Sequence, residues 1–569
     1  MVKRTHTCGE LKKSNTGAKV LLAGWIDSIR HHGKVCFMNL RDRYGTTQIV
    51  VKDEELLNKV RELGHEWVIS VEGEVLKRPN GMENPSLSTG EIDVEANKIV
   101  VISKSKVPPF VITDELKAKD ELRLKYRYLD LRRSPVQGAI IFKSKLYQSI
   151  MEYLHNQGFV NIETPILGRS TPEGARDFLV PSRFHPGKFY SLTQSPQIYK
   201  QLLIIAGFDR YYQLAKCFRD EDQRKDRQLE FTQLDVELAF ADEEEVFKLT
   251  EGLMEYIFMK VLGIKLHTPF KRITYKESIE KYGSDKPDTR YNLFLTDVSE
   301  LVQKSEFKIF KSADSVKCII WAGDIPRKEL DNFDTIVKGY GLGFSWLKFI
   351  GGEWSGPICK FFTKEILKEF RLSKDSTLLF VAGDQKRASE ALGGVRRELI
   401  DKFCQKRKEY DFVWVTDFPM FKRDEETHKL VPSHHIFVMP KEPELLKNNP
   451  ESATGRLYDL VLNGVELGTG SIRIHIRNLQ ERVMEIIGLD KDRRMRDFGC
   501  LLEALEYGAP PHGGIALGTD RLIGVMLNLP SIQDVIAFPK TLTGVGLLEG
   551  IPSEVDKGQL NELHIKVEK

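Results

Sequence analysis

The stretch from residue 231 to 240, FTQLDVELAF, alternates strictly between apolar and polar side chains. One parity holds Leu234, Val236, Leu238 and Phe240, and the other holds Gln233, Asp235 and Glu237. Successive side chains of a strand point to opposite faces, so this pattern predicts a strand with one face in a core and one polar face. Exposed sheet faces are often charged, but the neighbouring residues favour a ligand cleft here.

Those neighbours predict a charged hairpin. Residues 210–221, RYYQLAKCFRDE, are typical of a strand, and residues 222–228, DQRKDRQ, of a loop that leads into the alternating strand. Arg219 and Glu221 are two residues apart, so we expect both on one face of the first strand. Arginines and carboxylates gathered on a single face need each other or a charged ligand.

Length and composition set the class of protein. A chain of 569 residues is too long for a single hydrophobic core, and its length predicts three or four domains. No apolar run approaches the ~20 residues of a membrane helix, and the first residues lack the apolar stretch of an export signal. Seven cysteines without a C-x-x-C pair indicate a reducing compartment. We therefore expect a cytoplasmic protein without membrane contact.

The order of predicted elements divides the chain. Five strands with a helix between the third and fourth are typical of an OB barrel. Residues 1–50 carry nine Lys and Arg against three acids, which suits a polyanion, although a solvated basic face is the commoner explanation. The predicted organisation is an OB domain at 1–105, a linker at 106–135, a main domain at 136–285 and 413–550, an inserted α/β module at 286–412, and a C-terminal extension at 551–569.

Two further tracts carry candidate chemistry. Asp459 and Glu466 are seven residues apart and could hold Mg²⁺, which favours one or two carboxylates plus substrate phosphates. Arg473 follows them, and a glycine-rich tract leads into a helix predicted to begin near Thr519 with Arg521 in its first turn. The helix dipole disfavours a cation in the first turn, so a nearby anionic ligand would explain the position of Arg521. No glycine-rich phosphate loop occurs, so arginines and strands must hold any nucleotide.

Together these tracts resemble the three motifs of class II aminoacyl-tRNA synthetases. Motif 1 is the predicted helix and strand that end at Pro165, motif 2 is FRDE at 218–221 with its hairpin, and motif 3 is GTDR at 518–521. The stretches TPEGARDFLVPSR, QSPQIYKQLL, FTQLDVE and FPKT are similar to bacterial aspartyl-tRNA synthetases, and the resemblance covers nearly the whole chain.

The resemblance implies an α+β multidomain fold. Its parts are an N-terminal OB-fold barrel that binds the anticodon, a six-stranded antiparallel sheet flanked by helices, and a GAD-like insertion. It also implies a homodimer formed through motif 1. The implied activity uses ATP and Mg²⁺ to convert L-aspartate into aspartyl-adenylate, and then passes the aspartyl group to the 3′ end of tRNA. The main domain is then the catalytic domain. Its residues 136–285 carry motifs 1 and 2, and its residues 413–550 carry motif 3.

The resemblance also assigns roles to individual residues. The catalytic residues are Arg219, Glu466 and Arg521. The ATP-binding residues are Arg219, Asp220, Glu221, Gln228, Phe231, Glu466, Gly518, Thr519, Asp520 and Arg521. The aspartate-binding residues are Glu173, Gln197, Lys200, Arg219, Asp235, His434 and Arg473. Asp459 and Glu466 are the Mg²⁺ ligands. Thr519 stands where relatives often carry a leucine.

Within the aspartate pocket, Asp235 is expected to pair with the α-ammonium, and Arg473 with Lys200 to fix the side-chain carboxylate. Asparagine would then leave those two cations without an anion, which costs several kcal/mol for a buried charge.

Anticodon recognition is assigned to Arg30, Phe37 and Gln48. For Phe37 a place in the barrel core is the competing interpretation. His32 and Gly81 resemble the pair found in relatives that also charge asparagine tRNA, which is a hypothesis for this chain.

Two alternatives remain at the level of sequence. A synthetase for asparagine or lysine would share the architecture and the ATP site, although QIYK at 197–200, Asp235 and Arg473 argue against it. A non-catalytic tRNA-binding protein would not need Arg219, Glu466 and Arg521, which are all present.

Overall fold

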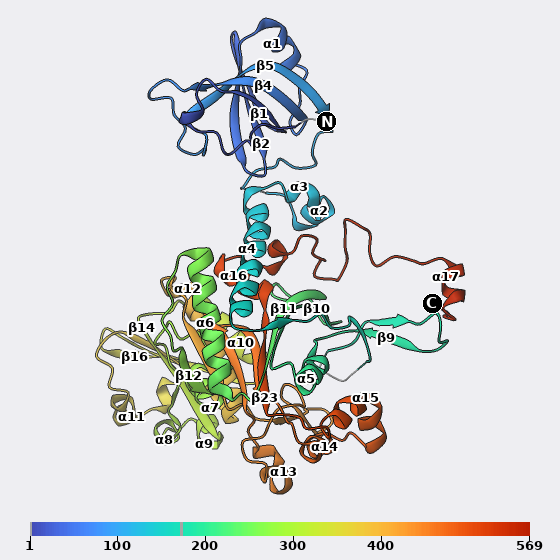
Figure 1. Cartoon of the computed structure of the whole chain (residues 1–569). Coiled ribbons are helices and arrows are strands. Elements are labelled where there is room, and N and C mark those ends of the chain that lie inside the picture. The colour runs from blue at the N-terminus through green and yellow to red at the C-terminus, as the bar shows by residue number, and fades with distance from the viewer. Residues whose placement is uncertain (1–2, 116, 171–174, 569) are drawn as a thin grey trace. The chain divides into compact units, whose positions relative to one another are not determined.

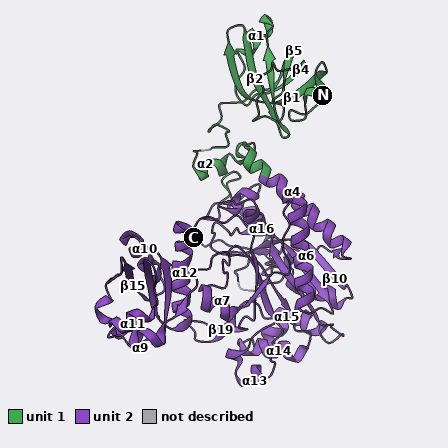
Figure 2. Ribbon diagram, turned by 90° about the vertical axis from the view of Figure 1, so that its left-hand side faces the viewer, with its two compact units in different colours: residues 1–138, 546–550 green, residues 139–545, 551–569 purple. Residues whose placement is uncertain are grey.

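The computed structural model describes residues 3–115, 117–170 and 175–568. The chain forms two compact units, residues 1–138 with 546–550 and residues 139–545 with 551–569 (Figure 2). Each unit is described by itself.

The first unit contains a closed five-stranded barrel in the order β1-β2-β3-β5-β4. Its elements are β1 (Lys19–His32), β2 (Val35–Asp42), β3 (Gly45–Val51), α1 (Glu54–Val60), β4 (Val68–Lys77) and β5 (Ile92–Ser103). Alternate residues of β2, namely Cys36, Met38 and Leu40, are buried in the barrel core. The predicted element order, with the helix between the third and fourth strands, is confirmed. Two short helices, α2 (Asp120–Lys125) and α3 (Arg127–Asp130), follow the barrel.

The second unit is built on an eight-stranded sheet (Figure 1). In spatial order its strands are β12 (Lys271–Thr274), β18 (Phe412–Thr416), β21 (Leu457–Leu462), β22 (Val465–Ile472), β23 (His512–Gly518), β11 (Glu230–Ala239), β10 (Arg210–Phe218) and β6 (Val160–Asn161). The six central strands are antiparallel to their neighbours, as expected. The sheet is wider than the six strands expected, because β12 and β6 add parallel pairs at its two edges.

Helices cover both faces of this sheet. The helices α4 (Ser134–Asn156), α6 (Glu243–Leu262) and α16 (Thr519–Met526) share one apolar core with Leu234, Val236 and Leu238 of β11. A second core on the opposite face includes residues of α7 (Tyr275–Tyr282), α14 (Arg477–Ile486) and α15 (Lys491–Ala504). The charged parity of β11 faces away from the first core, as its alternation predicts.

Several local predictions differ from the structure. Strand β10 ends at Phe218, so Arg219 and Glu221 lie beyond it and share no strand face. The long motif 1 strand is reduced to β6, because the chain leaves the sheet after Asn161. Phe240 is 70% exposed with a φ of 55°, because β11 ends at Ala239 and the chain turns away from the core there.

Within the predicted insertion, residues 296–403 form an α/β module with its own sheet, ordered β13-β14-β17-β15-β16. Its elements are β13 (Thr296–Asp297), α8 (Ser299–Val302), α9 (Lys308–Ser312), β14 (Ser315–Ala322), α10 (Arg327–Lys338), β15 (Gly343–Ile350), β16 (Glu353–Ser355), α11 (Lys364–Glu369), β17 (Ser376–Gly383) and α12 (Gln385–Phe403). Apolar clusters on both faces of this sheet give the module cores of its own. Its assignment as GAD-like remains a prediction.

The remaining elements are short. They are β7 (Leu167–Gly168), β8 (Leu179–Pro181), β9 (Phe189–Leu192), α5 (Gln197–Ile205), β19 (Phe421–Arg423), β20 (Leu430–Pro432), α13 (Leu445–Asn448) and α17 (Lys557–Glu562). Within the described residues, none of the helices combines the length and the apolar character needed to cross a bilayer.

Candidate active site

A cavity of about 270 Å³ opens on the polar side of β11 and β22. Eight of the ten residues predicted to bind ATP line it: Arg219, Glu221, Gln228, Phe231, Glu466, Gly518, Asp520 and Arg521. They come from the β10–β11 hairpin, from β22 and from the start of α16, and the β-sheet brings these distant segments together. Of the other two, Asp220 forms an isolated bridge with Arg176, and Thr519 is buried beneath the cavity wall.

Two of the arginines that line this cavity, Arg219 and Arg521, differ in their partners. The Arg219 Cζ atom lies 5.0 Å from the centre of the Phe231 ring, and within the described residues Arg219 makes no ion pair. Arg521 donates from Nη1 to the Glu466 carbonyl oxygen at 2.9 Å and lies 3.6 Å from the Glu466 carboxylate. Arg219 therefore presents a guanidinium that is available to an anionic ligand.

Thr519 and Asp520 connect the start of α16 to β11 by hydrogen bonds. Thr519 Oγ1 donates to the Thr232 carbonyl oxygen at 2.8 Å, and Asp520 Oδ2 accepts from the Thr232 N–H at 3.2 Å. Asp520 also forms an ion pair with Lys143 of α4. These contacts give both side chains a positioning role, which orients Arg521 toward the cavity.

The two candidate metal ligands lie on adjacent strands, β21 and β22. Asp459 is buried, and its Oδ1 accepts from Thr469 Oγ1 at 2.6 Å, whereas its Oδ2 has no hydrogen-bond partner among the described residues. Burial and the nearby charge of Glu466 raise the Asp459 pKa well above its ordinary value. Burial would also raise the Glu466 pKa, but Lys286 and Arg521 outweigh it and lower that pKa.

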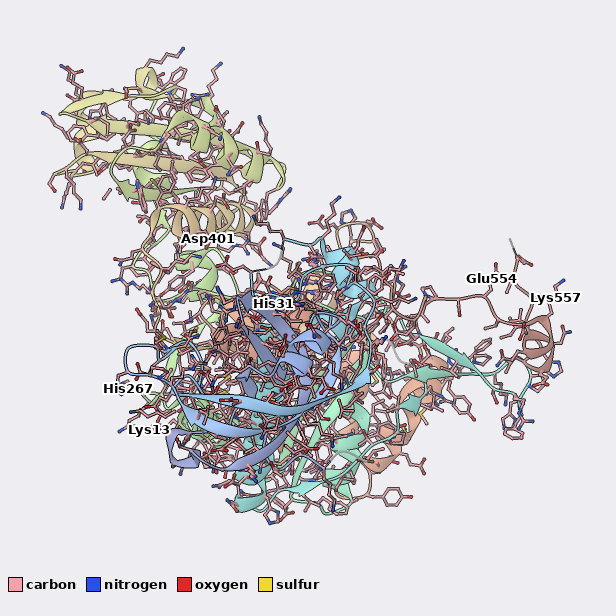
Figure 3. The ribbon with its side chains drawn as sticks, turned by 90° about the horizontal axis from the view of Figure 1, so that it is seen from above. Lys13, His31, His267, Asp401, Glu554 and Lys557 are labelled. Carbon is pink, nitrogen blue, oxygen red and sulfur yellow. The ribbon has the colours of Figure 1, made fainter. Side chains whose placement is uncertain are left out.

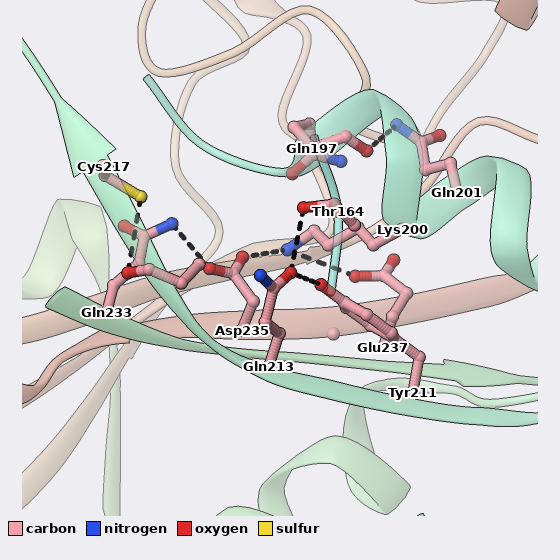
Figure 4. Close-up of polar contacts among 12 residues, drawn as sticks. Thr164, Gln197, Lys200, Gln201, Tyr211, Gln213, Cys217, Gln233, Asp235 and Glu237 are labelled. Atoms are coloured by element: carbon pink, nitrogen blue, oxygen red, sulfur yellow. Dashed lines mark hydrogen bonds and ion pairs between the residues drawn. The ribbon is translucent and has the colours of Figure 1, made fainter. Parts of the chain in front are cut away.

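A buried cluster of four charges lies beside the cavity, and Figure 4 shows three of its members, Lys200, Asp235 and Glu237. Lys200 Nζ donates to Asp235 Oδ1 at 3.0 Å and lies 3.4 Å from Glu237 Oε2. Arg473 donates to both oxygens of Glu237, from Nε at 2.8 Å and from Nη2 at 3.1 Å. Burial alone would raise the Glu237 pKa, but Arg473 and Lys200 lower it to about 2. Glu237 therefore stays ionised and joins the two cations.

Gln233 connects this charge cluster with the cavity. It lines the cavity, and its Nε2 donates to Asp235 Oδ2 at 2.7 Å. Gln233, Asp235 and Glu237 pair in register with Gly518, Ala516 and Gly514 of β23. At Gly514 a Cβ atom would lie 2.0 Å from the Val236 carbonyl oxygen and 2.5 Å from Glu237 Oε2, so only glycine leaves room for this carboxylate.

Three other residues are predicted to bind aspartate: Gln197, His434 and Glu173. Gln197 lies on α5, the helix that also carries Lys200. The His434 ring packs edge-on against Phe418 with centroids 4.9 Å apart. Glu173 lies outside the described residues.

His435, which the sequence analysis did not single out, faces the guanidinium directly. Arg473 Nη1 donates to its Nε2 at 3.1 Å, and the Phe437 N–H faces its Nδ1 at 3.2 Å. Burial, reinforced by the charge of Arg473, lowers the His435 pKa well below its ordinary value. His435 is therefore neutral and accepts a hydrogen bond from Arg473.

The barrel unit carries the residues predicted to read the anticodon on one outer face. Phe37 pairs in register with Arg30, and its neighbours Cys36 and Met38 take the buried parity, so Phe37 lies outside the barrel core. Arg30 Nη2 donates to Gln48 Oε1 at 3.5 Å. These three side chains are therefore adjacent on a half-exposed surface.

The two residues of the discrimination hypothesis lie in turns of the same unit. His32 ends β1, with its ring 6.0 Å from the Phe37 ring, and Gly81 in the β4–β5 loop has a φ of 83°. His31, next to His32, and Lys13 are both exposed (Figure 3).

Sequence reasoning missed the bridging role of Glu237, although its parity placed it on the polar face. It also missed Gln233 as the link between the two sites and Lys286 as a partner of Glu466. The alternation was a usable signal for the first two, whereas nothing in the sequence pattern distinguishes Lys286 from other surface lysines.

Comparisons with known proteins agree with this architecture. The family of class II tRNA synthetases (D, K and N) matches residues 119–542, and the OB-fold nucleic acid binding domain matches residues 20–102. The chain belongs to the class II tRNA synthetases of this group. More narrowly, the relatives that it matches over its whole length carry the name aspartate--tRNA(Asp/Asn) ligase.

Two of these relatives come from Caldanaerobacter subterraneus subsp. tengcongensis and Dictyoglomus turgidum. They are 46% and 47% identical, over 100% of this chain and 99% and 98% of their own lengths. Among solved structures, asparaginyl-tRNA synthetase from Pyrococcus horikoshii with asparaginyl-adenylate has a TM-score of 0.62 at 22% identity, and the match covers 95% of this chain and 99% of that chain. At this identity the structural likeness shows the fold alone.

Proposed function

We propose that this protein attaches L-aspartate to the 3′ end of tRNA in two steps that consume ATP. The observation that carries the proposal is the junction at Gln233, which lines the arginine-rich cavity and hydrogen-bonds Asp235 of the adjoining charge cluster. An amino acid in the cluster and a nucleotide in the cavity would meet at this residue. The whole-length relatives named as ligases for aspartate and tRNA(Asp/Asn) support the same reaction.

The amino acid is recognised by the donors that the charge cluster leaves free. Lys200 has three N–H donors, and Asp235 and Glu237 engage two of them. Arg473 has five, and the hydrogen bonds that it makes within the described residues leave one Nη2 hydrogen unused. The two free hydrogens can bind the two oxygens of an aspartate side chain, while Asp235 receives the α-ammonium group.

This arrangement corrects the selectivity argument drawn from the sequence. Asp235 and Glu237 together already balance the charges of Lys200 and Arg473, so asparagine would not leave these cations without an anion. Asparagine has one acceptor oxygen and one NH₂ group, and its NH₂ would face an N–H donor. That mismatch, rather than an unpaired charge, opposes its binding.

In the activation step the aspartate α-carboxylate attacks the α-phosphate of ATP, and pyrophosphate leaves. Arg219, which is free of ion pairs within the described residues, is placed to neutralise charge on the reacting carboxylate and phosphate. Arg521 and Gln228 hold the rest of the nucleotide, and Phe231 offers a ring to the adenine. In the transfer step a hydroxyl of the terminal adenosine of tRNA attacks the aspartyl carbonyl of the adenylate, and AMP leaves.

The residues present fit Mg²⁺. The orphaned Oδ2 of Asp459 is a buried acceptor that lacks a cation or donor among the described residues, and Glu466 adds a second carboxylate beside the cavity. Within the described residues no group of three or more His, Cys, Asp or Glu side chains forms a metal site. Two carboxylates are what Mg²⁺ requires when phosphates supply further oxygens, and the bound ion would neutralise phosphate charge.

The proposal extends to partners and location. Arg30, Phe37 and Gln48 bind the anticodon, and His32 with Gly81 allows asparagine tRNA to be charged as well as aspartate tRNA. The protein acts in the cytoplasm as a homodimer, which sedimentation would test.

The test is aspartate-dependent exchange of pyrophosphate into ATP. Replacement of Arg473 by Leu removes the donors to the side-chain carboxylate, so exchange should be nearly abolished at ordinary aspartate concentrations. The matched control is R477L, because Arg477 pairs with Glu481 on the partly exposed α14. Retained exchange in R473L would show that the pocket is misassigned. Charging of purified asparagine tRNA with labelled aspartate tests the wider tRNA range, and absence of product would dismiss it.

A further inference from the structure

The metal-ligand candidate Glu466 has a cationic partner that comes from outside the three synthetase motifs. Lys286 Nζ lies 2.8 Å from Glu466 Oε2, and the two side chains are 37% and 22% exposed. This ion pair places the Lys286 ammonium group beside the carboxylate that a metal ion would use.

The segment that carries Lys286 is fixed on the side of the insertion. Gly283 and Gly393 bring α7 and α12 into direct backbone contact, since a Cβ atom on Gly393 would lie 2.1 Å from the Gly283 carbonyl oxygen. The buried Arg396 of α12 donates from Nη2 to the Asp288 carbonyl oxygen at 2.9 Å. Helix α12 ends two residues after Asp401, which Figure 3 labels.

The same segment is also fixed on the side of the catalytic sheet. Gly464, in the turn between β21 and β22, has a φ of 81°, and a Cβ atom there would lie 3.2 Å from Asp288 Cβ. The Lys286 N–H donates to Ser284 Oγ at 3.0 Å. The backbone around Lys286 is thus held between α12 and the hairpin that carries Asp459 and Glu466.

We propose that Lys286 is a resident counter-ion of the metal-binding carboxylates. Its ammonium group neutralises Glu466 in the ligand-free protein, and it leaves this carboxylate when a divalent cation arrives with ATP. One carboxylate oxygen cannot serve both cations, because a divalent ion and an ammonium group at such short range repel each other strongly. The insertion therefore supplies a positioning residue to the nucleotide site. This inference rests on the proposed function, since it needs Asp459 and Glu466 to bind a metal.

The experiment measures binding of Mn²⁺ alone, without nucleotide, to the full-length protein by calorimetry. Removal of the competing charge in K286M should tighten the Glu466-dependent site about tenfold, and K286R should leave it near the wild-type affinity. The matched control is K281M, because Lys281 of α7 pairs with Glu277 at 2.7 Å on the surface. This control should bind Mn²⁺ as the wild type does.

Two further variants separate the possible failures. K286Q keeps a polar end group without charge and must show the same tightening as K286M, so it carries the test if thermal denaturation shows K286M to be poorly folded. An unchanged or weaker affinity in both variants overturns the role of Lys286. In E466Q the Mn²⁺ site should be lost, and if E466Q binds Mn²⁺ as the wild type does, the proposed metal site itself is wrong.

Discussion

Replacement of Glu237 by Gln tests the electrostatic centre of the site. Glutamine has the same shape, but Lys200 and Arg473 would lose the anion that they share. The Glu237 pKa of about 2, against an ordinary value of 4.5, corresponds to about 3 kcal/mol of stability at neutral pH, at ~1.4 kcal/mol for each pKa unit. A loss of this size agrees with the ~3–5 kcal/mol that breaking a buried ion pair costs.

The direction in which stability changes with pH follows from the depressed pKa of Glu237. The folded-state pKa is depressed, so the contribution is fully present above pH 4.5 and is lost as the pH falls through 2. E237Q should therefore unfold more easily than the wild type at pH 7, and the difference should shrink progressively in acid. Aspartate should stabilise E237Q more weakly than the wild type, because the donors are no longer held in place.

The assay is denaturant unfolding at pH 7 and at pH 4, followed by a signal from the catalytic unit. E243Q is the matched control, because Glu243 pairs with Arg456 at a partly exposed position and such pairs contribute at most ~1 kcal/mol. If E237Q lies within about 1 kcal/mol of the wild type at pH 7, Glu237 does not neutralise the two cations.

Three further predictions concern other parts of the molecule. F37A should weaken tRNA binding by ~1–3 kcal/mol, the contribution of one base stacked on an aromatic ring, as measured by filter binding. Y44A, which changes an exposed barrel residue, should leave tRNA binding unchanged. Equal losses in the two variants would contradict the assignment. The depressed pKa of His435 means that below pH 6.5 only the unfolded chain takes up this proton, so the wild type loses stability as the pH falls. H435Q should reduce this pH dependence of the unfolding free energy by up to ~1.4 kcal/mol per pH unit. An unchanged pH profile would refute this role. D459N should raise the Mg²⁺ concentration needed for half-maximal pyrophosphate exchange about tenfold, and an unshifted Mg²⁺ titration would exclude this ligand.

The sequence predicts the parts of this fold that depend on local periodicity. The alternation of β11 identifies both its buried and its polar face, because the period of a strand is independent of what packs against it. The start of α16 at Thr519 follows from a glycine-rich tract before an amphipathic run. The OB barrel follows from the order of its strands and its single helix.

The contacts that determine charge balance are not local, and sequence patterns do not show them. Glu237 and Arg473 are 236 positions apart, and their pairing requires β11, β23 and β22 to lie side by side. Lys286 meets Glu466 of β22 in a segment that follows the close contact between Gly283 and Gly393, which are also far apart in the sequence. Side-chain partners of this kind depend on the packed geometry. The sequence therefore identified the charged residues, but it predicted that Lys200 and Arg473 bind only the ligand, whereas both also contact Glu237.

The pairing of β11 with β23 limits which length changes the protein can accept. Gln233, Asp235 and Glu237 alternate with Leu234, Val236 and Leu238, so deletion of one residue inside β11 would turn three polar groups into the apolar core and three apolar groups into the ligand site. Natural variants and engineered libraries should therefore keep the length of this strand fixed.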